Sequence, residues 1–238
     1  RTDPFPSAPS LTGNEKTQPV PGYGPDGAEV KITYSLWSSV ENNTIEYSIA
    51  NPTKCLSNYA QYNTSRDWLK ASDSNDALWG NPKGGERNSD NNYVNKGSKS
   101  FYDPCPVGYR VPPADVFRTF TTTGGYTQDP SSFDVVDVNG DGVIDAKDYN
   151  YGWSFNMKEG SLFFPAAARY DGSYAMLMGS KSGLWGSYWG NSPAKSYGAT
   201  TGFGFCVLAF MNEAAGTSVS ATASAGRADA YSVRCVKE

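Results

Sequence analysis

Hydrophobic and polar residues alternate along two short stretches near the start of the chain. In AEVKITYSLW (28–37), every second residue from Val30 to Leu36 is apolar, and TIEYSIA (44–50) repeats this period of two. Such a period is typical of strands that bury one face. Because turn-forming residues separate the two stretches at 39–43, the pattern predicts a β-hairpin.

The second half of the chain predicts one short helix and several strands. PPADVFRTF (112–120) favours a helix, because Pro113 suits a first helical turn. Its apolar residues Val116, Phe117 and Phe120 would then share one face. Strands are predicted where apolar runs lie between Gly-rich turns, in SLFFPAAARY (161–170), SYAMLMG (173–179), FGFCVLAFMN (203–212) and YSVRCVK (231–237).

The chain divides into an arm and one domain. Residues 1–27 are rich in Pro, Gly, Ser and Thr, which predicts an extended linker or arm. We expect residues 28–238 to form a single domain, with the hairpin and a long loop in 28–100 and the main core in 101–238. Two tryptophans of the long loop would fix it to that core: Trp68 and Trp79.

Composition favours a loop-rich β protein outside the cell. Charged residues make up 18% of the chain, below the ~25% usual for soluble domains. Asn, Ser, Thr, Gly and Tyr carry the polarity instead, and they suit turns and half-exposed strands. We therefore predict an α+β, β-rich fold. Neither a membrane span nor the apolar core of a signal peptide is visible, so we expect the export signal or anchor to lie outside this sequence.

The charge pattern and the absence of histidine make several classes of function improbable or impossible. The net charge is −4 and the Lys and Arg residues are scattered, which disfavours nucleic-acid binding. The chain contains no His, which excludes catalytic mechanisms and zinc sites that depend on an imidazole. The acidic residues show no catalytic signature, so we expect no enzyme and assign no catalytic residues. Four cysteines at wide spacings favour disulfides in an oxidising compartment over four buried thiols.

DVNGDGVIDAKD (137–148) is the most specific motif in the chain. An EF-hand-type calcium loop needs oxygen ligands at positions 1, 3, 5, 7 and 12 and a glycine at position 6, and Gly142 fills that turn. The loop resembles the calcium repeat of dockerins, although neither a second copy nor a convincing exiting helix is present. The alternative is a metal-free turn. The predicted ligands of a structural Ca²⁺ are Asp137, Asn139, Asp141, the carbonyl of Val143, Asp145 through a water, and Asp148.

Four further segments resemble, in order, motifs of the Fibrobacter succinogenes major paralogous domain family. They are YDPCPVGYRVPPADVF (102–117), FFPAAARYDGSYAM (163–176), GSYWGNSP (186–193) and YSVRCVK (231–237). The family is similar to the C-type-lectin-like fold, which implies an irregular antiparallel sheet with one or two short helices and long loops. The resemblance also implies a Cys105–Cys235 disulfide that joins the two ends of this unit. Cys55 and Cys206 are left for a second pair by elimination. The sugar-chelating EPN, QPD and WND signatures of C-type lectins are absent.

The segment 169–191 is the candidate ligand surface. It is dense in Tyr and Trp separated by Gly and Ser, a composition that binding surfaces use. The alternative is core packing, which we expect for Trp189. The residues predicted to bind ligand are Tyr170, Tyr174, Trp185, Tyr188 and Asn191.

These features together predict a non-enzymatic adhesin or ligand-binding module on a bacterial cell surface. Its partner would be a glycan or a host or bacterial surface protein. One alternative is a structural subunit or tip of a surface fibre or pilus, with the N-terminal arm docking on other subunits. A second alternative is an accessory domain of a carbohydrate-active enzyme.

Overall fold

The computed structural model describes the second half of the chain almost continuously and the first half in short pieces. The continuous ranges are 94–171, 181–194, 204–213 and 216–238. The shorter pieces are 15–17, 22–23, 26, 28–30, 33–35, 44–51, 54–56, 68–69, 76–83, 88–89 and 176–177.

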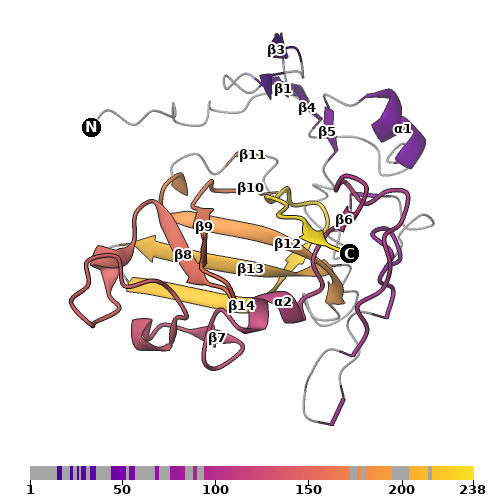
Figure 1. Ribbon diagram of the computed structural model, residues 1–238. Coiled ribbons are helices and arrows are strands. Elements are labelled where there is room, and N and C mark those ends of the chain that lie inside the picture. Colours follow the sequence, from indigo (N-terminus) through magenta and orange to yellow (C-terminus); the bar gives the residue numbers. More distant parts are fainter. Residues whose placement is uncertain are drawn as a thin grey trace.

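A four-stranded antiparallel sheet, in the order β12-β13-β14-β7, is the centre of the fold (Figure 1). Its strands are β12 (Trp185–Ala194), β13 (Gly204–Glu213), β14 (Gly216–Gly226) and β7 (Tyr126–Thr127). The apolar run of β13 makes it a natural central strand. β14, GTSVSATASAG, was not predicted, because its small polar residues carry little hydrophobic signal and only its pairing partners define it as a strand.

A hairpin and a short helix cover one face of this sheet (Figure 1). The hairpin consists of β8 (Gly152–Asn156) and β9 (Ser161–Pro165), and the helix is α2 (Asp115–Arg118). The predicted helix is therefore confirmed, and Phe117 is buried as expected. The remaining elements are α1 (Ile45–Ala50), the 3₁₀ turns η3 (Pro130–Ser132) and η4 (Ala146–Asp148), and the short strands β1 (Glu15–Thr17), β2 (Gly22–Tyr23), β3 (Glu29–Val30), β4 (Thr33–Ser35), β5 (Lys54–Leu56), β6 (Tyr109–Arg110), β10 (Tyr170–Asp171), β11 (Met176–Leu177) and β15 (Val236–Lys237).

The main core lies between the sheet and the hairpin and is largely aromatic. Phe120 stacks on Phe155 at 4.2 Å between ring centroids, and Phe164 meets the edges of both rings. Gly186 on β12 makes room for this core, because a Cβ there would come within 2.1 Å of the Phe210 ring. Burial of each such side chain contributes about 1.5–3 kcal/mol, so this cluster is the main source of stability. Its buried members are Phe117, Phe120, Phe133, Val135, Trp153, Phe155, Phe164, Ala166, Tyr188, Leu208, Phe210 and Val219.

The two ends of the 101–238 unit are tied together. Cys105 and Cys235 form the disulfide that the family resemblance implied, with their Cα atoms 5.8 Å apart. Next to it, β15 pairs antiparallel with β6. The buried carboxylate of Asp103 accepts hydrogen bonds from the backbone N–H groups of Cys105 (2.8 Å) and Val111 (3.0 Å). Strand pairing, covalent bond and carboxylate therefore close the unit at one place.

The predicted N-terminal hairpin is wrong in its second half. Residues 45–50 form the helix α1, because Thr44 caps it: its side-chain oxygen accepts the N–H of Tyr47 at 3.0 Å. No residue of α1 is buried, so the alternation there does not mark a buried strand face. Residues 33–35 do form a strand, β4, but it pairs with β1 and β5.

The N-terminal segment is also more structured than predicted. Residues 1–27 were expected to be an unpaired arm, yet β1 pairs antiparallel with β4 and β2 pairs with β3. Backbone pairing does not require the apolar periodicity on which the prediction relied. Within the described pieces, these pairings make residues 15–17 and 22–23 part of small sheets.

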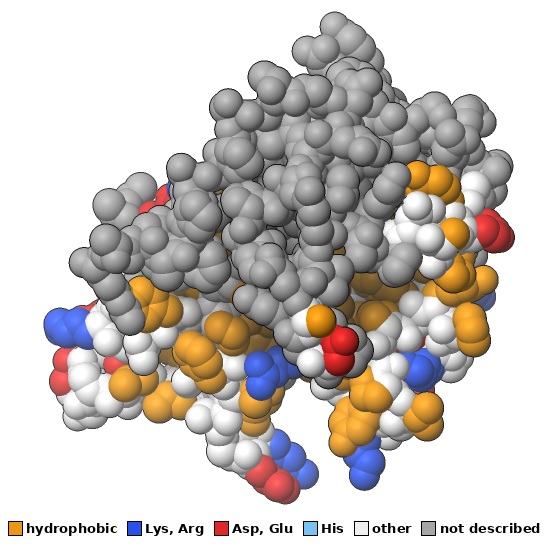
Figure 2. Space-filling model, turned by 90° about the horizontal axis from the view of Figure 1, so that it is seen from above, with side chains coloured by type: hydrophobic (Ala, Val, Ile, Leu, Met, Phe, Trp, Pro, Cys, Tyr) orange, Lys and Arg blue, Asp and Glu red, His pale blue; other side chains and the backbone are white. Residues whose placement is uncertain are grey.

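The surface of the described part mixes charge with apolar groups. On the face shown in Figure 2, Lys and Arg side chains lie singly among Asp, Glu and hydrophobic side chains. This agrees with the scattered basic residues of the sequence. No helix in the described part of the chain has the length and apolar character that crossing a membrane requires.

Replacing Cys105 and Cys235 together with Ser is expected to lower the free energy of unfolding by about 5 kcal/mol, because the bridge spans 130 residues and restricts the unfolded chain. Urea unfolding followed by tryptophan fluorescence measures the change against the oxidised wild type. An unchanged midpoint and slope would contradict the expectation.

Asp103→Asn is expected to lower the free energy of unfolding by about 3 kcal/mol, because it removes the buried charge that faces the Lys99 ammonium at 3.1 Å. The same urea titration measures it. Glu159→Gln, an exposed carboxylate in the β8–β9 turn, is the matched control and should unfold like the wild type. Equal midpoints for the two variants would show that the Asp103 charge does not matter.

Candidate functional site

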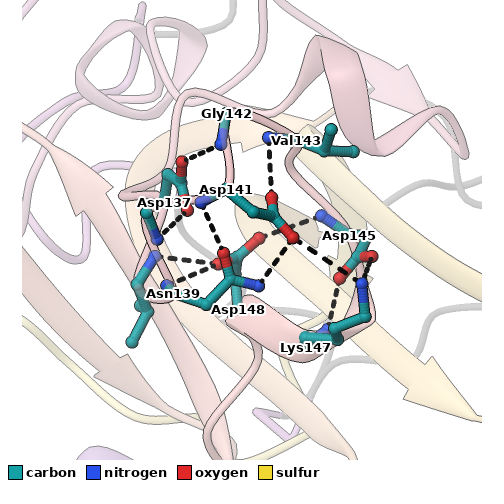
Figure 3. Close-up of polar contacts among 10 residues, drawn as sticks. Asp137, Asn139, Asp141, Gly142, Val143, Asp145, Lys147 and Asp148 are labelled. Atoms are coloured by element: carbon teal, nitrogen blue, oxygen red, sulfur yellow. Dashed lines mark hydrogen bonds and ion pairs between the residues drawn. The ribbon is translucent and has the colours of Figure 1, made fainter.

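The predicted calcium loop connects β7 to β8, and its polar side chains turn inward onto its own backbone (Figure 3). The two carboxylate oxygens of Asp137 accept the N–H groups of Gly140 and Gly142, each at 2.7 Å. Asn139 Oδ1 accepts the N–H of Asp141 at 2.8 Å. Gly142 has φ +82°, a conformation that suits glycine at the sharp turn of a calcium loop.

Asp148, at the last ligand position, closes the loop from the other side. It is buried, and its Oδ1 accepts the N–H of Val138 at 2.8 Å while its Oδ2 accepts the N–H of Asp145 at 3.0 Å. Asp145 in turn caps η4 by accepting the N–H of Lys147 at 2.7 Å. Backbone N–H groups of the loop itself therefore fix the side chains at both the first and the last ligand position, Asp137 and Asp148.

A lysine inside the loop competes for the same carboxylates. The Nζ of Lys147 lies 2.9 Å from Asp145 and 3.7 Å from Asp141. Its hydrogen bonds hold the pKa of the Asp145 carboxyl below its usual range, and Asp145 raises the pKa of Lys147. Among the described residues, no three His, Cys, Asp or Glu side chains are grouped closely enough to hold a metal ion.

The donor set nevertheless fits a hard cation in its chemistry. Carboxylate, amide and carbonyl oxygens are the ligands that Ca²⁺ takes. Each carboxylate has about four lone-pair positions, so the N–H contacts of Asp137 and Asp148 leave some of them for a metal. A calcium ion would have to displace the Lys147 ammonium from Asp141 and Asp145.

The predicted ligand surface is wrong at Tyr188 and Asn191, whose side chains are buried in the core, whereas Tyr170 is buried but lines an open pocket. Tyr170 is 4% exposed, Tyr188 is 3% exposed and Asn191 is fully buried. The sequence showed a dense aromatic segment but not which side of a strand each ring takes. A strand places successive side chains on opposite faces, and Tyr188 falls on the core face of β12.

Contacts explain why these side chains belong to the core. The Tyr188 ring meets the edge of Phe164 at 4.9 Å, and its hydroxyl donates to the carbonyl of Pro165 at 2.7 Å. Asn191 Oδ1 accepts the side-chain N–H of Asn81 at 2.8 Å. Tyr188 and Asn191 therefore hold the domain together.

The other two predicted positions differ. Tyr174 lies outside the described residues. Trp185 is half-buried, with Arg169 over its ring at 5.1 Å and Lys181 at 4.8 Å. Trp189 is buried, as expected for the structural tryptophan of this segment. The side chains of Cys55 and Cys206, the second predicted pair, also fall outside the described part.

An open pocket lies beside the disulfide end of the domain, and we call it the aromatic pocket. Its volume is about 280 Å³. It is formed where three segments meet: the long loop, the neighbourhood of β12, and the stretch that leads to β15. Its lining residues are Trp68, Leu78, Trp79, Tyr170, Trp189, Arg227, Ala228, Asp229, Ala230, Tyr231 and Val233.

The walls of the aromatic pocket are rings packed against one another. Trp189 stacks on Tyr231 at 4.6 Å, and the edge of Trp79 meets Trp189 at 5.8 Å. This confirms Trp79 as an anchor of the long loop. Tyr170 and Trp189 form a buried floor, whereas Val233 is exposed at the rim. Packing therefore fixes the rings of Trp79, Trp189 and Tyr231 in these walls.

The charged groups of the aromatic pocket are joined in pairs. The buried Arg227 forms an ion pair with Asp76 of the long loop. Asp229 Oδ2 accepts the hydroxyl hydrogen of Tyr231 at 3.0 Å, and the Tyr231 oxygen accepts an N–H of Arg169 at 3.3 Å. The pocket thus has an acceptor, a hydroxyl and aromatic faces at fixed positions.

Sequence reasoning missed this pocket for an identifiable reason. It treated Trp68 and Trp79 only as anchors and Tyr231 only as part of a strand motif. These residues are far apart in the sequence and meet only after the long loop packs on the core. The available signal was the pair of tryptophans in an otherwise polar loop.

Tyr188 makes stability depend on pH in the alkaline range. Burial raises the pKa of Tyr188 to about 12, so the folded state keeps a proton that the unfolded chain loses near its ordinary pKa of about 10. Its contribution is complete below about pH 10 and falls by about 1.4 kcal/mol per pH unit as the pH rises toward 12. Tyr188→Phe is expected to reduce this slope in urea titrations.

The same variant should lose about 1 kcal/mol at neutral pH, because the hydrogen bond to Pro165 disappears. Tyr126→Phe, at an exposed tyrosine of β7, is the control and should keep the wild-type slope. An unchanged slope for Tyr188→Phe would show that this hydroxyl titrates as if exposed.

Comparison with known proteins identified no relative of this chain. No protein-family model matches the chain, and no similar curated protein or solved structure was found. The functional argument therefore depends on the loop and the aromatic pocket themselves.

Proposed function

We propose that the chain is a non-enzymatic ligand-binding or adhesive module of a bacterial surface protein, and that it binds its ligand in the aromatic pocket. The observation that carries the proposal is the pocket itself. Rigid Trp and Tyr rings surround it, and a carboxylate and a hydroxyl lie within it. Aromatic anchors with few polar groups are typical of ligand sites.

The scaffold supports binding because it fixes the pocket before a ligand arrives. The segment that lines the pocket, which includes Tyr231 and Val233, runs directly to the Cys105–Cys235 bridge, and the long loop is held through the Asp76–Arg227 ion pair. Side chains that are already ordered lose little entropy on binding. The ligand would be a glycan or a host or bacterial surface protein.

The proposal places the protein outside the cell and in the family that its motifs resemble. A disulfide persists in oxidising compartments, which favours an exported protein at the bacterial surface. The antiparallel sheet with two short helices and the joined ends agree with a C-type-lectin-like domain. The lack of any His and of a catalytic signature favours binding without turnover.

We also propose that the 137–148 loop holds one structural Ca²⁺. All ligand positions carry oxygen donors, and Gly142 adopts the turn that such a loop requires. The ion would replace the Lys147 ammonium as the positive charge among the carboxylates. It would stabilise the long excursion between β7 and β8.

One alternative is a subunit or tip of a surface fibre. It is favoured by β1, which comes from the first residues of the chain and pairs with the edge of β4. The equivalent strand of a neighbouring subunit would make the same backbone contacts. The other alternative, an accessory domain of a carbohydrate-active enzyme, would use the same aromatic pocket.

Calorimetry on chelator-treated protein is expected to show one calcium site of micromolar to millimolar affinity, the range of sensor and extracellular calcium loops. Asp137→Ala should abolish the binding heat, because Asp137 supplies the first ligand. Lys147→Ala should bind more tightly than the wild type, because the competing ammonium is gone.

The control for calcium binding is Glu159→Ala, which removes one negative charge outside the loop. It should bind like the wild type. The absence of heat from a folded wild-type sample would refute the calcium proposal and leave the metal-free turn.

An array of glycans and extracellular-matrix proteins is expected to capture the wild-type chain. Trp68→Ala should reduce capture at least about tenfold, the loss of a single aromatic contact of about 1.4 kcal/mol. Trp185→Ala removes a tryptophan outside the pocket and should retain binding.

Three other results would redirect the proposal. Loss of binding in Trp185→Ala alone would move the site toward the predicted segment around that residue. No capture, together with polymerisation that ends when residues 1–27 are removed, would favour the fibre subunit. Release of reducing sugar from a bound glycan would show that the protein is an enzyme.

A further inference from the structure

We infer that the aromatic pocket recognises an uncharged sugar unit of a glycan, and that it does so without calcium. The inference rests on the proposed ligand-binding function and specifies its ligand. A pyranose ring has an apolar face of C–H groups and a rim of hydroxyls. The pocket offers both complements: aromatic faces, and a carboxylate beside a phenol.

Trp68 is the ring best placed to stack on a sugar. It lines the pocket and is half-exposed. Within the described part of the chain, it has no stacking partner, in contrast to Trp79 and Trp189, which contact each other. Because Trp68 is half-exposed, part of its ring surface can contact a ligand.

Asp229 and Tyr231 provide the hydroxyl recognition. The Asp229 carboxylate accepts a hydrogen from the Tyr231 hydroxyl, and a carboxylate, with about four lone-pair positions, can accept several hydrogen bonds at once. Arg169 donates to the Tyr231 oxygen, so that hydroxyl keeps its hydrogen directed toward Asp229. The acceptor is thereby held in one orientation before the sugar arrives.

Charge balance favours a neutral ligand. The positive charge of Arg227 is neutralised by Asp76, and the negative charge of Asp229 is linked through Tyr231 to Arg169. An acidic sugar would bring a second carboxylate close to Asp229, and like charges at short distance repel each other. An uncharged sugar avoids this repulsion.

The size of the site favours one terminal unit of a glycan. Its volume of about 280 Å³ is at the lower end of the range for small-molecule pockets. The exposed rim at Ala230 and Val233 leaves the chain beyond that unit in solvent. No residue of the 137–148 loop lines the pocket, so calcium takes no direct part.

The test is calorimetry and saturation-transfer NMR on the full chain with glucose, galactose, mannose, N-acetylglucosamine, lactose and cellobiose. At least one of these sugars is expected to bind, and sialyllactose should bind at least about tenfold more weakly than lactose if lactose is bound. Affinity should change less than about twofold between about 0.05 M and 0.5 M NaCl, because no net charge is engaged. A chelator should leave the affinity unchanged at temperatures well below unfolding.

Matched variants separate pocket binding from structural effects. Trp68→Ala and Asp229→Asn should each weaken sugar binding at least about tenfold. Tyr231→Phe keeps the ring that stacks on Trp189 and should weaken binding through loss of the hydroxyl alone. Phe101→Ala, at an exposed ring outside the pocket, is the control and should bind within about twofold of the wild type, and urea titration confirms that each variant is folded.

The outcomes distinguish the inference from the proposed function. Binding of matrix proteins, but of no sugar, with loss of that binding in Trp68→Ala would overturn the sugar inference and keep the ligand-binding function. Sugar binding that a chelator abolishes, or that favours the sialylated form, would also overturn it. A folded chain that binds neither class would refute both.

Discussion

The closure between the start and the end of the 101–238 unit is the constraint on which the rest of the structure depends. The Cys105–Cys235 bridge, the β6–β15 pair and the buried Asp103 carboxylate all lie at this junction. Because both ends are fixed, the chain between them can include long loops without losing the closed structure of the unit. The calcium loop and the polar turns are such loops, and the aromatic pocket lies beside the junction because the last residues before β15 pass there.

The core and the pocket of the domain lie at different places on the central sheet. One face, with Tyr188, Leu208 and Phe210, is filled by the β8–β9 hairpin and α2 and provides the aromatic core. The end of β12 and the segment before β15 instead meet the long loop and leave a pocket between them. A rigid core on one side allows the other region to be built from loops, because its position does not depend on its own hydrophobic content.

At several residues, the secondary structure or burial predicted from the local sequence differs from that in the folded domain. The 112–120 helix and the 203–212 strand were predictable, because their apolar residues lie close together in the sequence, and the helix buries Phe117 while β13 buries Leu208 and Phe210. The 44–50 segment was not, since a cap at Thr44 outweighed its alternation. β14 escaped prediction because its small residues owe their strand conformation to neighbours on both sides. Tyr188 and Asn191 were expected at a ligand surface, yet both side chains are buried.

By itself, the sequence determined the β-rich class and the short helix, because each depends on residues close together in the chain. Its resemblance to a known family also identified the Cys105–Cys235 pair. Only the tertiary structure decided which aromatic rings form the core and which surround a pocket. That choice depends on which residues distant in sequence pack against each ring: Trp79 meets Trp189 and Asp76 meets Arg227 only after the long loop folds onto the sheet. Contacts of this range leave no periodic signal in the chain, whereas the motifs that did predict structure are local.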